Sequence, residues 1–128
     1  MKSKEFKLMY WLEGRIEKEI TPAIDTYNDY DCETDNAIIE LKVRDKYYPT
    51  KMIELDKLVR CLEIAKNKNK NFVYVVQDPK GVYYLDITKN SSSILKSPAS
   101  KIPCPKTTEF SNNNKIDKLV YNIDMIKL

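Results

Sequence analysis

The 128 residues include 22 basic and 19 acidic side chains, a formal net charge of +3, and 42% hydrophobic residues. This balance is typical of a globular protein with one core, so we expect a single domain over residues 1–128. No apolar run approaches the ~18 residues of a membrane span, and the charged start of the chain is unlike a secretory signal. We therefore expect an intracellular (cytoplasmic) protein with no membrane partner. The small positive charge permits nucleic-acid binding without requiring it.

The sequence contains no histidine and three widely spaced cysteines, Cys32, Cys61 and Cys104. The spacing argues against a structural zinc site and a disulfide framework, so we expect small buried thiols. The lack of histidine also excludes Ser-His and Cys-His nucleophile pairs. Hydrolytic chemistry would have to use carboxylates, lysine, tyrosine or metal-bound water.

The first half of the chain changes from a helical to an extended pattern. Residues 3–20 carry apolar side chains at helical spacing, which predicts a helix ended by Pro22. Residues 23–33 and 37–43 have the pattern of extended strands, and the short segment between them predicts a hairpin.

The second half begins with an amphipathic pattern over residues 51–66, which predicts another helix. Residues 72–76 and 82–87 then read as two strands. The Asp-Pro-Lys-Gly composition of residues 78–81 predicts the turn that joins them.

Residues 89–128 predict a loop-rich C-terminal extension. The segment 89–106 is rich in Ser, Lys and Pro and reads as loop, and 112–114 reads as a turn. Residues 119–126 predict a last strand or a short helix, and periodicity does not decide between them.

The first predicted hairpin brings acidic side chains together. A two-residue turn at Asp35-Asn36 would place Asp31 directly across from Glu40, with Cβ atoms roughly 5 Å apart. Because strand side chains alternate between faces, Lys42 shares the face of Glu40. Two carboxylates beside an ammonium suit a divalent cation better than a solvated sheet surface. The simpler interpretation is a solvated acidic face that Lys42 neutralises.

The order helix, strand, strand, helix, strand, strand, together with Asp31 and the triplet Glu40-Leu41-Lys42, resembles the PD-(D/E)XK nuclease superfamily. The resemblance covers about residues 5–88. In that family an Asp opens one strand, an acid-x-Lys triplet closes the next, and a helix follows. The resemblance implies an α/β (α+β), restriction-endonuclease-like fold, with a small central mixed β-sheet flanked by two helices.

The resemblance also implies a deoxyribonuclease that depends on Mg²⁺ or Mn²⁺. Asp31, Glu40 and the backbone carbonyl of Leu41 would hold the ion. Lys42 would orient or deprotonate the attacking water and stabilise the developing negative charge.

Two assignments within this site stay open. Many members of the family carry an acid on the first helix, for which Glu17 is the best match and Glu13 the second. Asp29 shares the predicted strand face of Asp31 and is the alternative first acid.

The expected contacts to DNA are basic and aromatic side chains near the hairpin: Arg15, Arg44, Tyr47, Tyr48, Lys51 and Lys57. The two tyrosines could stack on bases, which would favour single-stranded or distorted DNA. A domain of this size would need a homodimer to cut both strands of a duplex.

Two other classes of function compete with the nuclease. One is a non-catalytic nuclease-fold module that binds nucleic acid or a protein partner. The other is a small accessory protein, encoded by a virus or mobile element, whose sheet is only a scaffold. The sequence does not distinguish endo from exo action or reveal the strandedness of the substrate.

Overall fold

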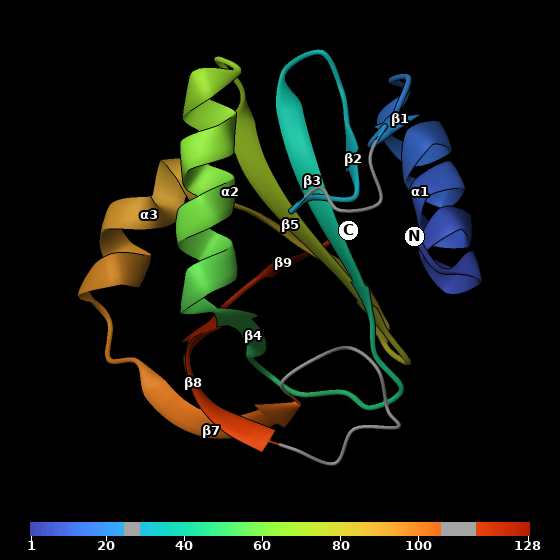
Figure 1. Ribbon diagram of the computed structural model, residues 1–128. Coiled ribbons are helices and arrows are strands. Elements are labelled where there is room, and N and C mark those ends of the chain that lie inside the picture. Colours follow the sequence, from blue (N-terminus) through green and yellow to red (C-terminus); the bar gives the residue numbers. More distant parts are fainter. Residues whose placement is uncertain (25–28, 106–114) are drawn as a thin grey trace.

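The computed structural model describes residues 1–24, 29–105 and 115–128, which form a mixed α/β structure with two sheets (Figure 1). In chain order the elements are α1 (Ser3–Ile16), β1 (Thr21–Pro22), β2 (Cys32–Glu33), β3 (Ala37–Val43), β4 (Lys51–Glu54), α2 (Leu55–Asn67), β5 (Asn71–Asp78), β6 (Gly81–Asp86), α3 (Ile87–Lys96), β7 (Ser100–Pro105), β8 (Lys115–Ile123) and β9 (Ile126–Lys127).

The larger sheet is mixed, with strand order β1-β2-β3-β5-β6-β9. Strands β3 and β5 are parallel, and the other strand pairs in the described parts of the chain are antiparallel. A parallel pair needs a crossover, and residues 44–70 supply it with β4 and α2. Strand β4 also pairs with β8 in the smaller sheet, β4-β8-β7.

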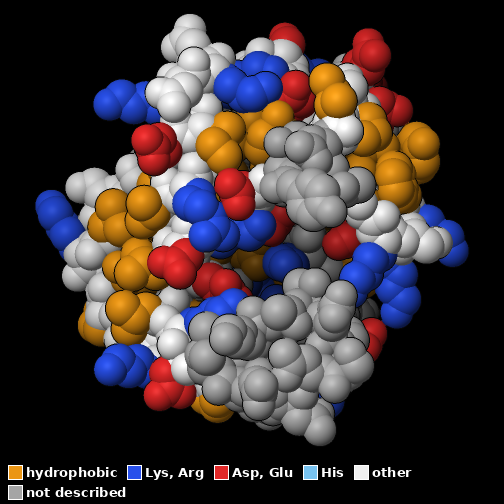
Figure 2. All heavy atoms as spheres, in the orientation of Figure 1, with side chains coloured by type: hydrophobic (Ala, Val, Ile, Leu, Met, Phe, Trp, Pro, Cys, Tyr) orange, Lys and Arg blue, Asp and Glu red, His pale blue; other side chains and the backbone are white. Residues whose placement is uncertain are grey.

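In the orientation of Figure 1, charged side chains of both signs surround a hollow near the middle of the visible face (Figure 2).

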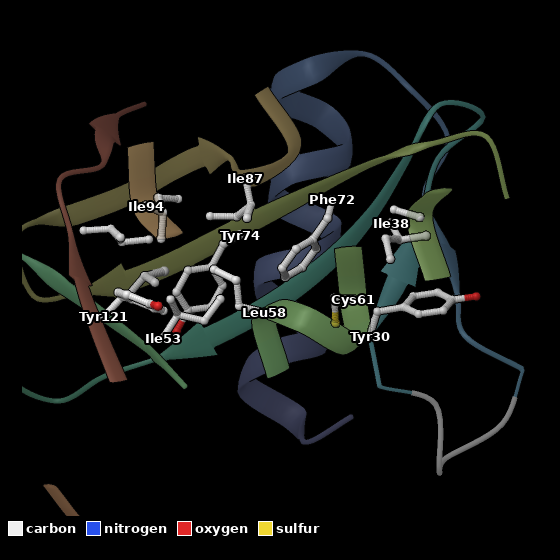
Figure 3. Close-up of a cluster of buried hydrophobic side chains, with 13 residues drawn as sticks. Tyr30, Ile38, Ile53, Leu58, Cys61, Phe72, Tyr74, Ile87, Ile94 and Tyr121 are labelled. Atoms are coloured by element: carbon white, nitrogen blue, oxygen red, sulfur yellow. The ribbon is translucent and has the colours of Figure 1, made fainter. Parts of the chain in front are cut away.

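The two faces of the larger sheet bury separate hydrophobic cores. Helix α1 covers one face, where Leu12 packs in a cluster with Ile39 and Leu41. Helices α2 and α3 and the smaller sheet cover the other face, where Ile38 and Phe72 belong to the larger cluster (Figures 1 and 3). The period-two alternation of β3 therefore sends Ile38 toward α2 and its neighbour Ile39 toward α1.

Both predicted helices are shorter than expected. Helix α1 ends at Ile16, because Glu17 adopts a left-handed backbone with φ 55° and the Glu13 Oε2 atom accepts a hydrogen bond from the Ile20 amide at 2.7 Å. Residues 51–54, predicted as the start of the second helix, form β4 instead. Their pairing with β8, far away in the sequence, overrides the helical pattern.

The C-terminal extension is more regular than predicted. The expected loop 89–106 is wrong over most of its described length, since it contains most of α3 and all of β7. The Asp86 side chain caps α3 by accepting a hydrogen bond from the Lys89 amide at 3.0 Å. The alternative of a final strand is confirmed by β8, whereas the turn predicted at 112–114 lies outside the described residues. The hairpin of β5 and β6 is confirmed.

No described helix is long and apolar enough to cross a membrane.

A buried ion pair joins the two sheets. Lys51 begins β4, Asp78 ends β5, and the Nζ and Oδ2 atoms lie 2.7 Å apart, with the side chains only 6% and 1% exposed. The Lys51 ammonium also donates to the Tyr48 carbonyl and lies over the rings of Tyr47 and Tyr83, 4.4 and 4.3 Å from their centroids. Lys51 therefore has a structural role, because a carboxylate, a carbonyl and two aromatic rings surround its ammonium group.

We expect Asp78→Asn to destabilise the fold by about 3 kcal/mol, because it leaves the Lys51 charge buried without a counter-ion. Urea denaturation followed by circular dichroism measures the change. The control is Asp35→Asn, which breaks a more exposed pair with Lys18 and should lose much less unfolding free energy. Equal losses of unfolding free energy in the two variants would contradict a structural role for the buried ion pair of Lys51 and Asp78.

Candidate functional site

The register predicted for the first hairpin is confirmed. Cys32 pairs with Ile39, and continuing that register by one residue places Asp31 opposite Glu40. The Asp31 amide donates a hydrogen bond to the Ile39 carbonyl at 2.9 Å. The Oδ2 atom of the Asp31 side chain accepts a hydrogen bond from the Leu41 amide at 2.8 Å. The backbone of β3 therefore fixes the Asp31 carboxylate beside Glu40.

Glu40 is the most strongly perturbed acid of this group. Its side chain is 4% exposed, and burial raises its pKa to about 8, helped by a hydrogen bond to the Asp31 carboxyl group and by the charge of Asp31. Two ammonium groups oppose this shift: Lys57 Nζ lies 3.2 Å from Glu40 Oε2, and Lys42 Nζ lies 3.9 Å from it. A buried acid with a shifted pKa and specific charged partners is common in functional sites.

Asp29, the alternative first acid, is directed elsewhere. Its carboxylate pairs with Arg60 Nε at 3.0 Å. Its carbonyl accepts hydrogen bonds from Lys57 Nζ at 2.7 Å and from Cys61 Sγ at 3.5 Å. These contacts hold Asp29 against α2, so the structure favours Asp31 as the acid that pairs with Glu40.

The acid pair and the neighbouring backbone offer hard oxygen ligands. The N–H and C=O groups of a strand residue point to the same side, so the Leu41 carbonyl lies on the side of β3 where its amide meets Asp31. Two carboxylates and a carbonyl are ligands that suit Mg²⁺, which takes its other ligands from water and substrate. The parts of the chain that the structure describes hold no group of three or more acidic or cysteine side chains suited to a metal. An ion here would depend on Asp31, Glu40 and backbone oxygen.

The structure does not bring the predicted first-helix residues to this site. The buried side of α1 packs with Ile39 and Leu41, on the opposite face of the sheet from the Lys57 contact of Glu40. Glu17 is exposed at the end of α1, and the Glu13 carboxylate binds the backbone after that end. Arg15 is exposed on the same helix. These three assignments are corrected by the position of α1 behind the sheet.

A cavity of about 600 Å³ opens beyond Lys42 at the carboxyl ends of β3 and β5. Its walls combine cationic, acidic, aromatic and apolar side chains: Arg44, Asp45, Lys46, Tyr48, Thr50, Lys51, Met52, Tyr74, Val76, Asp78 and Asn122. Val76 pairs with Lys42 in the parallel ladder, so the cavity adjoins the site on the same face.

Part of the predicted DNA-contact group lies at this opening. Arg44 and the exposed Tyr48 line the cavity. The Tyr47 ring lies against two ammonium groups, those of Lys51 at 4.4 Å and Lys80 at 3.9 Å. Lys51 is buried in its ion pair and cannot take a phosphate, which corrects that prediction.

Lys57 has a role that sequence reasoning missed. It was expected to contact DNA, but its ammonium bridges Glu40 and the Asp29 carbonyl. The available signal was its position directly before Leu58, which belongs to the buried stripe of α2. A lysine beside a buried stripe can turn its charged end toward a buried acid on the strand beneath.

Comparison with models of known protein families and with curated protein sequences finds no match.

The pKa of Glu40 predicts a pH dependence of stability. A carboxyl group with a folded pKa near 8 and an unfolded pKa near 4.5 favours the folded state most below pH 4.5. That contribution is lost as the pH rises toward 8. Between pH 5 and 8, we expect the wild type to lose roughly 2–4 kcal/mol relative to Glu40→Gln.

Urea denaturation at intervals across this pH range measures the difference. Glu63→Gln, an exposed change on α2, is the control and should follow the wild type. Parallel pH curves for wild type and Glu40→Gln would show that Glu40 is not protonated in the folded protein.

Proposed function

We propose that this protein is a metal-dependent nuclease that hydrolyses DNA phosphodiester bonds. The observation that supports this best is the cross-strand pair of Asp31 and Glu40, with Lys42 Nζ 3.9 Å from Glu40. The order of α1, β1 to β3, α2 and β5 also agrees with the PD-(D/E)XK resemblance, which remains part of the proposal.

The metal ligands that the site offers determine its possible chemistry. A Mg²⁺ or Mn²⁺ ion held by Asp31, Glu40 and the Leu41 carbonyl would neutralise phosphate charge and lower the pKa of a bound water. The Leu41 amide fixes the Asp31 carboxylate in place. Lys42, whose side chain is 40% exposed, can reach a phosphate or water from the solvent side and stabilise negative charge there.

The surroundings of Glu40 support the same chemistry. Helix α2 covers the carboxyl group, which strengthens its electrostatic interactions by excluding water. Below its pKa, Glu40 carries a proton that a divalent cation would have to displace. The basic side chain of Arg44 follows two residues after Lys42 and can bind a second phosphate of the same strand.

One observation favours a second candidate, a non-catalytic nuclease-fold module that binds nucleic acid or a protein. Lys57 Nζ already lies 3.2 Å from Glu40 Oε2, and the Glu40 side chain is 4% exposed. The ammonium therefore occupies part of the space that a cation would need. In this alternative Lys57 replaces the metal ion and stabilises the buried acid.

We expect Asp31→Asn, Glu40→Gln and Lys42→Ala each to lower DNA cleavage at least ~100-fold, because each removes a metal ligand or a charge-stabilising group. Cleavage of single-stranded, duplex and branched DNA is measured with Mg²⁺, with Mn²⁺ and with EDTA. Glu33→Gln is the matched acidic control on β2, and Lys66→Ala is the control for the lysine. Full activity in Glu40→Gln or Lys42→Ala would refute the proposed triad.

Metal titration separates the two candidates. Calorimetry with Mn²⁺ should give one site in the wild type, loss of that site in Glu40→Gln, and tighter binding in Lys57→Gln, because the competing ammonium is removed. The non-catalytic module predicts no heat of binding in the wild type and DNA binding that EDTA does not change. That result, together with no cleavage on any substrate, would overturn the nuclease.

A further inference from the structure

We propose that the cavity beyond Lys42 holds one unpaired nucleotide of the substrate strand, an inference that rests on the proposed nuclease function. The cavity lies on the same sheet face as the Asp31 and Glu40 pair. Lys42 stands between them, because its ladder partner Val76 is part of the cavity wall. A strand bound at the acid pair can therefore place its next nucleotide in the cavity.

The spacing of Lys42 and Arg44 along the protein chain fits a DNA strand that runs from the acid pair to the cavity. Lys42 and Arg44 are two residues apart, about 7 Å along an extended chain. Arg44 lines the cavity, and Lys42 pairs with Val76, which also lines it. Arg44 and Tyr74 both line the cavity, and the Tyr74 hydroxyl donates to the Met52 carbonyl at 3.0 Å. Arg44 therefore lies at the opening, where a phosphate would enter.

The charges of the lining favour an anionic ligand. Lys51 and Asp78 neutralise each other at 2.7 Å, and Asp45 has a partner in Lys4 at 3.7 Å. Arg44 and Lys46 form no ion pair with any residue in the described ranges, 1–24, 29–105 and 115–128. Two cations at the rim therefore remain available for a phosphate.

The interior of the cavity favours a nucleobase over a free anion. Met52, Tyr74 and Val76 supply apolar surface, while Thr50 and Asn122 supply groups that can hydrogen-bond a base edge. The volume of about 600 Å³ falls in the range of sites for small organic molecules. A flat ring with polar edges matches this combination.

The exposed Tyr48 side chain indicates that the bound strand is unpaired. Its ring is 59% exposed at the rim, where it can stack on a base. A base inside a duplex is already stacked and paired, so it would have to leave the helix to enter a cavity. The proposed ligand is therefore single-stranded DNA, a frayed end or an extruded nucleotide.

The test uses fluorescence anisotropy with a fluorescein-labelled dT6 strand in EDTA, so that binding is measured without cleavage. We expect Arg44→Ala and Tyr48→Ala each to weaken binding at least ~10-fold. The matched controls on α1, behind the sheet, are Arg15→Ala and Tyr10→Ala, which should bind as the wild type does. Tyr10 is 63% exposed, close to the value for Tyr48.

Competition identifies what the cavity recognises. We expect dTMP to displace dT6 better than thymidine does, and thymidine better than inorganic phosphate. A labelled blunt duplex should bind more weakly than dT6. Phosphate that competes as well as dTMP, or a duplex that binds as tightly as dT6, would overturn the proposal, as would equal weakening by Arg15→Ala and Arg44→Ala.

These experiments can refute the nuclease proposal and the nucleotide-site proposal independently of each other. If Arg44→Ala and Tyr48→Ala weaken dT6 binding but no DNA is cleaved with either metal, the nuclease is refuted and the nucleotide site stands. If Glu40→Gln abolishes cleavage while the cavity variants bind dT6 normally, the nucleotide site is refuted and the nuclease stands.

Discussion

The parallel pairing of β3 with β5 is the constraint on which the rest of the structure depends. It requires a crossover, and the crossover carries β4 and α2 across one face of the sheet. That face is the one onto which Glu40 projects, so the acid becomes buried and acquires Lys57 as a partner. The same crossover starts the smaller sheet and forms part of the wall of the cavity. The burial of Glu40 and the cavity are thus two consequences of the same crossover connection.

Burial and charge oppose each other at Glu40. Removing a carboxylate from water costs several kcal/mol unless the group is protonated or paired with a cation. The raised pKa shows that the ammonium groups of Lys57 and Lys42 do not fully offset the burial and the neighbouring Asp31 carboxyl. The site therefore favours one more positive charge, which either a proton or a divalent cation can supply. This preference links the stability of the fold to the proposed chemistry.

The sequence was most informative where the governing interaction is local. The turn chemistry before β3 and the period-two alternation were enough to predict that Asp31 faces Glu40. Strand β4 was missed because its partner strand lies more than sixty residues away (Glu54 pairs with Val120), which no window of sequence reveals. Glu17 was misplaced for a related reason: a helical pattern shows that α1 has a buried side, but not which face of the sheet it covers.

Lys57 determines how the two proposed functions differ physically. Its ammonium and a metal ion would compete for the same oxygen of Glu40, and the ammonium also holds the Asp29 carbonyl at 2.7 Å. A divalent ion would carry twice the charge and would bind Asp31 as well, so it could displace the ammonium if the Lys57 chain swings toward solvent. That chain is about one quarter exposed, which leaves it such a path. A nuclease would use Lys57 as a counter-ion that yields to the metal, whereas a binding module would keep it in place permanently.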